Sequence, residues 1–342
     1  MLKKLRNKFL SPVLYQLALL SEKVDRISDP VNNRQNTAIG LPEDNDKIMI
    51  TGFNEYDQMI EEIKKVHRGE SEETNDRILL NKYCLDFDEF VALFGSSPSD
   101  CDPFSREYTD WEMAFFSFLS GAGYDTKSEG LSNEDIAVHD NEPPTIYWDI
   151  DTRLLYMKTY TEFLDKCRPA MGMTVLELGC GWGNLLELFG RCGCHVTGID
   201  ASEGHADYTR NLLNALNIDN DIICGSFYDI ENVDREFDII VFESAFHHTG
   251  EPMRLMNILA DKLKENGRIY FLNEVFNDSY DRPWGIVRYD GESVFQIRYR
   301  GWLELGFRLD FFIELLGRTG LKLSNTYSMP NSTELYEVVK NK

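Results

Sequence analysis

Long apolar runs are absent from the sequence. No stretch reaches the roughly 18 apolar residues that a helix needs to cross a bilayer, so no membrane-spanning segment is predicted. The N-terminus contains basic residues but no apolar core followed by a small-residue cleavage site, so no signal peptide is predicted either.

Positive charge is scarce as well. The chain carries 35 Lys and Arg against 58 Asp and Glu, which gives a formal net charge of −23. Proteins bind the phosphates of nucleic acids through Lys and Arg, so this composition argues against a nucleic-acid partner.

Cysteine offers neither a disulfide framework nor a zinc site. There are seven cysteines, an odd number, and Cys192 and Cys194 stand too close together for the usual zinc-binding spacing. No second pair complements them. We therefore expect seven reduced thiols in a cytoplasmic protein and predict no metal site.

Residues 1–27 are predicted to form an amphipathic helix with a short seam. The apolar seam positions, three and four residues apart, are Leu10, Val13, Leu17, Leu20, Val24 and Ile27. Three interpretations stay open. The seam could form a coiled-coil homo-oligomer through residues 10–27, make peripheral contact with an anionic membrane, or pack on its own domain. We favour self-association.

A linker and a small helical region are predicted next. Residues 28–46 are polar and contain Pro, Gly and Asn, which is typical of a linker. Residues 47–143 predict a small, mainly helical region. Its most helical segments are Tyr56–Val66, Phe87–Phe94 and Trp111–Leu119.

From residue 144 to residue 342, predicted helices and strands alternate. An amphipathic helix over Thr152–Cys167 comes first. Strands are then predicted at 174–178, 195–199, 221–223, 237–242, 267–273, 321–327 and 334–340, and helices at 183–190, 203–216, 251–264 and 308–318. This order predicts an α/β fold with a doubly wound, seven-stranded parallel sheet and an antiparallel strand near its end.

The stretch Val175–Asp200 carries the clearest functional signal. An apolar strand leads into the run E-L-G-C-G-W-G, in which Gly179, Gly181 and Gly183 alternate with other residues. A helix and a second strand follow, and that strand ends in Asp200. This order of elements, a strand, a glycine turn, a helix, a strand and an acid, is typical of a site for an adenosine-containing ligand.

The spacing of these glycines resembles that of class I methyltransferases, which use S-adenosyl-L-methionine. A dinucleotide fingerprint would need a third glycine where this chain has Asn184. The resemblance covers roughly residues 150–342. It implies a Rossmann-like, seven-stranded methyltransferase sheet and S-adenosyl-L-methionine as the cofactor.

The resemblance also implies roles for single residues. Asp200 can accept two hydrogen bonds from vicinal ribose hydroxyls, and Glu177 is expected near the methionine ammonium group. Ser226 stands where the family has an aspartate for the adenine amino group, and Phe227 flanks the ring. The predicted cofactor-binding residues are Glu177, Gly179, Cys180, Gly181, Gly183, Asp200, Ala201, Ser226, Phe227 and Phe242.

Three ionisable residues follow the predicted strand over 237–242. The carboxyl end of that strand is expected to face the methyl donor, which makes Glu243, His247 and His248 the predicted catalytic residues. Methyl transfer to an alcohol requires removal of a proton, and a His suits that role near neutral pH. A His at this place is also common in the family without a catalytic role.

Residues 275–307 are predicted to be an insertion that recognises the acceptor. They are far longer than the roughly 2–6 residues that usually connect elements of an α/β unit. The predicted substrate-binding residues are Trp284, Arg288, Asp290, Glu292 and Trp302. Aromatic faces and forked donors suit a sugar. The alternative is a lid packed for stability, with its arginines in ion pairs.

The runs PWG, DGES and GWLELGFR in this insertion, together with residues 102–121, resemble bacterial methyltransferases found with polysaccharide biosynthesis. We therefore expect methyl transfer to a sugar hydroxyl of a surface glycan, free or linked to a nucleotide or lipid. Two alternatives stay open: a natural-product or other small-molecule O- or N-methyltransferase, and a scaffold that binds the cofactor without catalysis.

Overall fold

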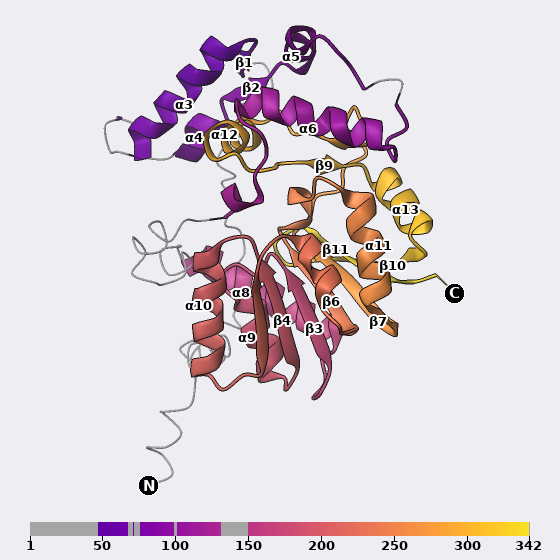
Figure 1. Cartoon of the computed structure of the whole chain (residues 1–342). Helices are drawn as coiled ribbons and strands as arrows, with labels where there is room; N and C mark the ends of the chain where they lie inside the picture. Colours follow the sequence, from indigo (N-terminus) through magenta and orange to yellow (C-terminus); the bar gives the residue numbers. More distant parts are fainter. Residues whose placement is uncertain (1–46, 68–70, 72–75, 99–100, 131–149, 342) are drawn as a thin grey trace, which may run out of the picture. The chain divides into compact units, whose positions relative to one another are not determined.

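A seven-stranded sheet forms the centre of the structure, a computed structural model that describes residues 47–67, 71, 76–98, 101–130 and 150–341 (Figure 1). Its strands are β3 (Thr174–Leu178), β4 (His195–Asp200), β5 (Asn220–Cys224), β6 (Phe237–Glu243), β7 (Leu263–Leu272), β10 (Leu321–Ser328) and β11 (Glu334–Lys340). They lie in the order β10-β11-β7-β6-β3-β4-β5. The predicted helix over residues 1–27 and linker over 28–46 lie outside the described residues.

The pairing confirms the predicted fold class. Strands β5, β4, β3, β6 and β7 run parallel to one another, and β11 pairs antiparallel with both β7 and β10. Within residues 144–342, one boundary differs from the predicted one by more than two residues: β7 starts at Leu263, within the helix predicted for 251–264. Leu263 is fully buried and pairs with Phe237, so it extends the sheet rather than the helix.

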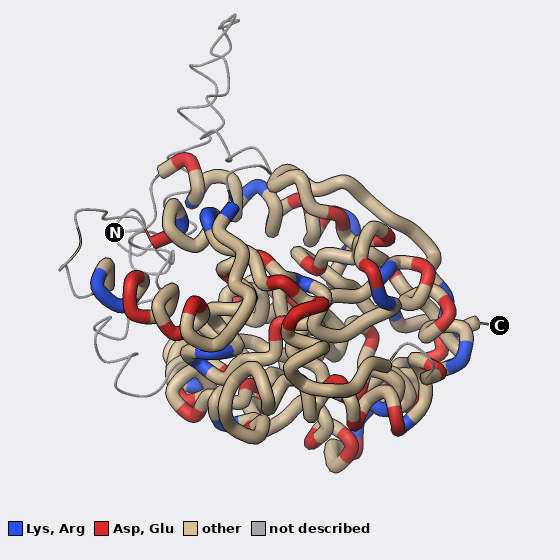
Figure 2. The backbone as a smooth tube through the Cα atoms, turned by 90° about the horizontal axis from the view of Figure 1, so that it is seen from above, with Lys and Arg blue, Asp and Glu red and all other residues tan. Residues whose placement is uncertain are grey.

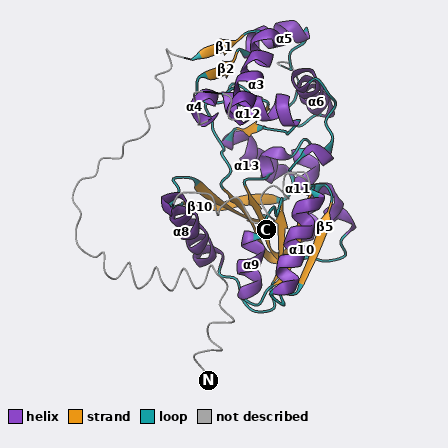
Figure 3. Ribbon diagram, turned by 90° about the vertical axis from the view of Figure 1, so that its left-hand side faces the viewer, coloured by secondary structure: helices purple, strands orange, loops and turns teal. Residues whose placement is uncertain are grey.

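Helices cover both faces of the sheet because successive strand residues are buried on alternate faces. The helices α8 (Ile150–Cys167), α9 (Asn184–Arg191) and α10 (Glu203–Ala215) pack on one face. Figure 3 looks onto that face. The helices α11 (Pro252–Lys262) and α13 (Leu309–Arg318) pack on the other face, against strand residues such as Leu176 and Phe242.

The described part of region 47–143 is mainly helical, as predicted. Its helices are α3 (Phe53–His67), α4 (Asp76–Leu80), α5 (Phe87–Phe94), α6 (Arg106–Ser120) and the 3-10 turn η2 (Thr126–Ser128). Two short parallel strands, β1 (Ile48–Ile50) and β2 (Tyr83–Leu85), were not predicted. At three residues each, they are too short to give a clear alternating pattern.

The insertion is folded rather than an open loop. It contains β8 (Trp284–Gly285), α12 (Gly291–Phe295), the π-helical turn η6 (Gln296–Arg300) and β9 (Gly306–Phe307). The Tyr108 hydroxyl donates to the Trp284 carbonyl at 2.7 Å, and the Tyr56 hydroxyl donates to the Val294 carbonyl at 2.6 Å. Residues 44–342 form one compact unit, so the helical region and the predicted domain 144–342 share a core.

A buried ion pair joins this insertion to α6. The Glu112 side chain is 1 % exposed and contacts the Arg282 guanidinium, while its second oxygen accepts from the Ile286 N–H at 3.0 Å. The Arg282 guanidinium also lies 4.3 Å from the centre of the Phe87 ring. Such a pair holds both elements in place because neither charge has access to water.

The distribution of charged residues and the state of the cysteines agree with what the composition predicts. Lys and Arg are scattered among Asp and Glu in Figure 2. All seven cysteines lie in the described residues and are free thiols. None of the helices in the described ranges is both long and apolar enough to cross a membrane.

We expect Glu112→Gln to lower the free energy of unfolding by about 3 kcal/mol, because it leaves the Arg282 charge buried without its partner. Urea unfolding followed by circular dichroism measures the change. The control is Glu162→Gln, which removes an exposed ion pair with Lys166 on α8 and should cost less than about 1 kcal/mol. Equal losses in the two variants would contradict a structural role for the buried pair.

Candidate functional site

The predicted glycine turn lies at the carboxyl ends of β3 and β4. Gly179 has φ +76°, and a Cβ there would come within 2.6 Å of the Ala245 Cβ. Gly181 has φ +45° and faces open space. A side chain would therefore be strained at both positions, and at Gly179 it would also clash. Cys180 belongs to the turn, but its buried sulfur points toward Gly198, away from the open side.

Asp200 at the end of β4 is fixed by backbone donors. Its Oδ2 accepts from the Gly181 N–H at 2.8 Å, and its Oδ1 accepts from the Ser202 N–H at 2.9 Å. The side chain is nearly buried but still lines a pocket. Each carboxylate oxygen retains a further lone pair, so Asp200 can accept hydrogen bonds from a ligand.

Ser226 and Phe227 lie where β5 leads into the 3-10 turn η4 (Phe227–Asn232). Ser226 donates from its N–H at 2.8 Å and from its hydroxyl at 3.1 Å to the Asp229 carboxylate. Its hydroxyl oxygen can still accept a hydrogen bond. The Asp229 carboxylate therefore reaches back to Ser226. Phe242 is fully buried beneath Phe227, with the ring centres 6.0 Å apart.

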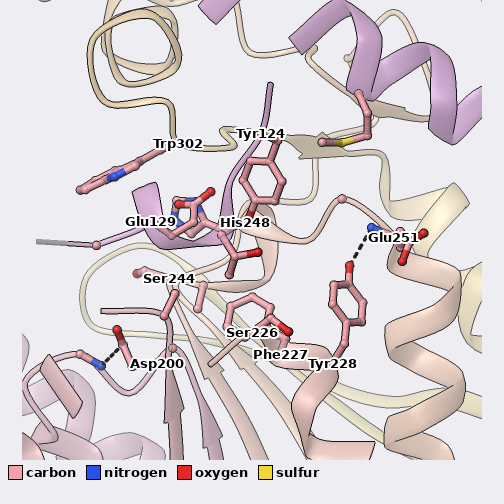
Figure 4. A pocket seen from close by; sticks show the side chains of 18 of the residues that line it. Tyr124, Glu129, Asp200, Ser226, Phe227, Tyr228, Ser244, His248, Glu251 and Trp302 are labelled. Carbon is pink, nitrogen blue, oxygen red and sulfur yellow. Dashed lines mark hydrogen bonds and ion pairs between the residues drawn. The ribbon is translucent and has the colours of Figure 1, made fainter. Parts of the chain in front are cut away.

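One pocket of about 440 Å³ joins these residues to the helical region and the insertion (Figure 4). Of the predicted cofactor residues, it is lined by Gly179, Gly181, Asp200, Ala201, Ser226 and Phe227. Of the predicted catalytic and substrate-binding residues, it is lined by His248 and Trp302. The pocket is not lined by Gly183 and Cys180, which belong to the glycine turn, or by Phe242, which lies beneath Phe227.

Glu177 and Glu243 point to the face of the sheet that α8 covers. The Oε2 atom of Glu177 is buried and has no hydrogen-bond partner among the described residues. Burial and the nearby Glu243 and Asp200 raise the pKa of Glu177 well above its ordinary value. Burial raises the pKa of Glu243 to about 7, although it accepts from the Asn273 amide at 2.6 Å.

His247 lies beside the pocket rather than in it. Its Nδ1 is 2.9 Å from Oε2 of Glu274, whose other oxygen accepts from the N–H groups of Ala245 and Phe246 at 2.5 and 2.6 Å. Burial would raise the pKa of Glu274, but His247 and the two N–H groups lower it below its ordinary value. The pair therefore fixes the turn η5 (Phe246–His248).

His248 faces the pocket and meets a carboxylate from the helical region. Its Nδ1 is 3.2 Å from Oε2 of Glu129, an ion-pair contact that does not meet hydrogen-bond geometry. Burial alone would lower the pKa of His248, but the carboxylates of Glu129, Glu304 and Glu274 outweigh it and raise the pKa to about 9. The structure thus distinguishes the two histidines, because His248 lines the pocket and His247 does not, whereas the sequence favoured neither.

The structure does not bring the other predicted substrate-binding residues to this pocket. Trp284 is 1 % exposed, and its indole N–H donates to the Pro103 carbonyl. Arg288 donates to Glu304 at 2.8 Å. Asp290 caps α12, and Glu292 is exposed in the first turn of that helix. The polar groups of Trp284, Arg288 and Asp290 thus bind other parts of the protein.

Sequence analysis missed the part of the pocket that the helical region supplies. It is lined there by Arg106, Thr109, Asp110, Met113, Tyr124, Thr126, Glu129 and Gly130. No local pattern marks these residues as a site, because their link to the pocket is a contact between segments far apart in the chain. Ser244 and Ala245, directly after β6, could have been found from the strand-end rule.

One group of described residues has ligand types that suit a metal ion. Single ligand atoms of His247, His248 and Glu304 lie within 4.8 Å of one another. Other side chains already contact all three residues. Glu274 contacts His247, Glu129 contacts His248, and Arg288 pairs with Glu304. The absence of a metal site stays a prediction.

Comparison with known proteins identifies the sheet. The family described as "Methyltransferase domain" matches residues 175–267. The chain therefore carries an S-adenosyl-L-methionine-dependent methyltransferase domain, as the sequence predicts. Among solved structures, a methyltransferase from Clostridium acetobutylicum is 15 % identical with a TM-score of 0.44, over 61 % of this chain and 99 % of that one.

Two curated relatives are each similar over about a third of the chain. A glycine/sarcosine/dimethylglycine N-methyltransferase from Actinopolyspora halophila is 31 % identical over 31 % of this chain and 19 % of its own length. A ubiquinone biosynthesis O-methyltransferase from Coxiella burnetii is 30 % identical over 32 % of this chain and 47 % of its own length. The chain thus matches less than half of each relative.

We expect the His248 imidazole to titrate near pH 9 in the cofactor-free protein. Because this folded-state pKa exceeds the ordinary value of 6.5, the ion pairs of His248 stabilise the fold fully below about pH 6.5. That contribution is lost as the pH rises through about 9. An NMR titration of ¹⁵N-histidine-labelled protein measures the pKa, with His248→Gln to assign the signal. A midpoint at or below pH 7 would contradict the expectation.

Proposed function

We propose that the chain transfers a methyl group from S-adenosyl-L-methionine to a hydroxyl group, and that the acceptor is a sugar in bacterial surface-glycan biosynthesis. A single observation carries the proposal. One cavity joins the glycine turn and Asp200 to His248, Glu129 and Trp302, so a nucleoside site adjoins a proton acceptor and an aromatic face.

The residues at the carboxyl ends of β3 and β4 fit the cofactor. Asp200 can accept from the two ribose hydroxyls, and the open side of Gly181 lets a ligand approach the backbone. The buried, unpartnered oxygen of Glu177 suits the methionine ammonium group, whose positive charge would offset the burial that raises the pKa of Glu177. Phe227 offers a ring for the adenine.

The protein's part in the reaction is to orient the acceptor and to hold its proton. When bound, S-adenosyl-L-methionine supplies a methyl group: its carbon–sulfur bond breaks as the acceptor oxygen bonds to the carbon, and the electron pair stays on sulfur. The neutral form of His248 takes the acceptor's proton at Nε2, because Nδ1 lies 3.2 Å from the Glu129 carboxylate. The enclosing residues Tyr124 and Trp302 limit access of water.

The acceptor end of the pocket suits a sugar. Tyr124 and Trp302 present flat apolar surfaces, and Glu129 and Thr126 can hydrogen-bond to hydroxyls. A second groove of about 650 Å³ adjoins the pocket, and Arg106, Thr109 and Glu251 line both. A sugar linked to a nucleotide or lipid could extend into this groove.

Methylation of an amine is a second candidate function. The carboxylates of Glu129, Glu274 and Glu304 surround His248 and favour a positively charged acceptor. The relative from Actinopolyspora halophila is named for amine acceptors of this kind. A scaffold that binds the cofactor without catalysis predicts binding but no product. A cytoplasmic location, a homo-oligomer and peripheral membrane contact also stay predictions.

We expect two substitutions to distinguish the ribose-binding part of the cofactor site from the part that binds the methionine ammonium group. Asp200→Asn should weaken S-adenosylhomocysteine and methylthioadenosine alike, by about tenfold or more, because both ligands carry the ribose diol. Glu177→Gln should weaken only S-adenosylhomocysteine, because methylthioadenosine lacks the amino-acid part. Isothermal titration calorimetry measures both ligands, with Glu162→Gln as the control. Unchanged binding of both ligands to both variants would overturn the assignment.

We expect His248→Gln to lower kcat by roughly 10²- to 10⁴-fold, the range for loss of a general base. Its affinity for S-adenosylhomocysteine should stay within about threefold of the wild type. Mass spectrometry of methylated product from a panel of sugars, nucleotide sugars and small amines measures the transfer. Product from amines alone selects the second candidate, and cofactor binding without any product selects the scaffold.

A further inference from the structure

Glu129 is held at the edge of the pocket from several sides. Its Oε1 accepts from the Leu303 N–H at 2.8 Å, and its Oε2 contacts His248. Burial and the negative charge of Glu129 raise the pKa of the Tyr124 hydroxyl, so the two side chains are neighbours. The Glu129 side chain is only 12 % exposed. A carboxylate in this setting cannot change its rotamer without giving up several contacts, so its position relative to the imidazole is defined.

The backbone around Glu129 is fixed to the insertion as well. The Trp302 indole N–H donates to the Ser128 carbonyl at 2.6 Å, and the Ser128 hydroxyl donates to the Gly301 carbonyl at 3.0 Å. On the other side, a Cβ on Gly130 would come within 2.9 Å of the Ser202 Cβ, next to Asp200. The segment 124–130 therefore lies between the insertion and the ribose-binding end of the site.

We propose that Glu129 is a positioning residue for His248, which it orients through Nδ1 so that Nε2 faces the acceptor. This inference rests on the proposed function, in which His248 is the proton acceptor. It assigns a role to the insertion as well: residues 301–303 hold the segment that carries Glu129. The helical region would then contribute to the reaction itself, not only to the core.

Other charged groups around His248 are placed less directly. Glu274 contacts His247 and two backbone N–H groups, and Glu304 pairs with Arg288. The His247 ring lies 4.2 Å from the His248 ring, centre to centre. Of these groups, Glu129 alone contacts a nitrogen of His248 in the described residues. Its removal should therefore change the orientation of the ring more than removal of the others.

The test compares Glu129→Gln, Glu129→Asp and the control Asp125→Asn. Asp125 lies in the same segment and caps η2, but it does not line the pocket, so Asn removes a charge nearby and keeps a good cap. An NMR titration of His248 in the cofactor-free proteins gives a readout that needs no turnover. Steady-state kinetics over pH give the second readout, with kcat taken on the alkaline plateau, where His248 is neutral.

We expect Glu129→Gln to lower the pKa of His248 and to shift the kcat/KM profile to lower pH. Its plateau kcat should fall about 10- to 100-fold with acceptor KM changed less than about threefold, as for loss of a group that orients a reacting residue. Glu129→Asp should recover part of the loss, and Asp125→Asn should behave as the wild type. Adding Glu129→Gln to His248→Gln should cause no further loss, because the two residues act as a unit.

An unchanged His248 titration in Glu129→Gln overturns the inference, whether or not the wild type turns over. Losses that multiply in the double variant overturn it too, because Glu129 would then act independently of His248. Absence of methyl transfer by the wild type on every acceptor overturns the proposed function instead, and the titration still decides whether Glu129 controls His248. If Glu129→Gln does not fold, Glu129→Asp decides: wild-type kcat with wild-type titration overturns the inference.

Discussion

The buried ion pair of Glu112 and Arg282 is the contact on which the pocket's cover depends. Glu112 belongs to α6, the helix that leads into the segment carrying Glu129, and Arg282 lies in the insertion that also carries Trp302. Arg298 adds a second link, because its guanidinium donates to the Leu119 carbonyl at 3.1 Å. The helical region and the insertion, which form the pocket walls above the sheet, are thus fixed to each other before any ligand binds. Ligand binding therefore has to order less of the protein and loses less conformational entropy.

Local sequence patterns predicted the sheet and the residues that meet at the carboxyl ends of β3 and β4. Apolar strands, the glycine turn and Asp200 each follow from residues close together in the chain, and the structure reproduces that order. The pair β1 and β2 escaped prediction because three-residue strands carry no clear period. Glu129 escaped because its partner His248 lies far away in the sequence, and only the fold reveals that contact.

The insertion shows why residue type alone misplaces a binding site. Forked arginine donors suit a sugar, yet Arg288 meets Glu304 within the insertion, and Arg282 meets Glu112. An excess of carboxylates makes such internal partners easy to find, and burial of an arginine requires one. Trp302 alone among the five predicted residues lines the pocket, and it does so from the segment that binds Ser128.

Negative charge around the site matches the charge of the methyl donor. Oε2 of Glu177 is buried without a hydrogen-bond partner among the described residues, and Glu129 stands beside His248 in the pocket, so the cofactor-free site favours positive charge. S-adenosyl-L-methionine brings a sulfonium and an ammonium, whereas its product has lost the sulfonium charge and should bind less well. A cation entering this cavity also lowers the pKa of His248 from about 9. Under the proposed function, this shift would make the imidazole a proton acceptor once the donor is bound, with Glu129 holding its orientation.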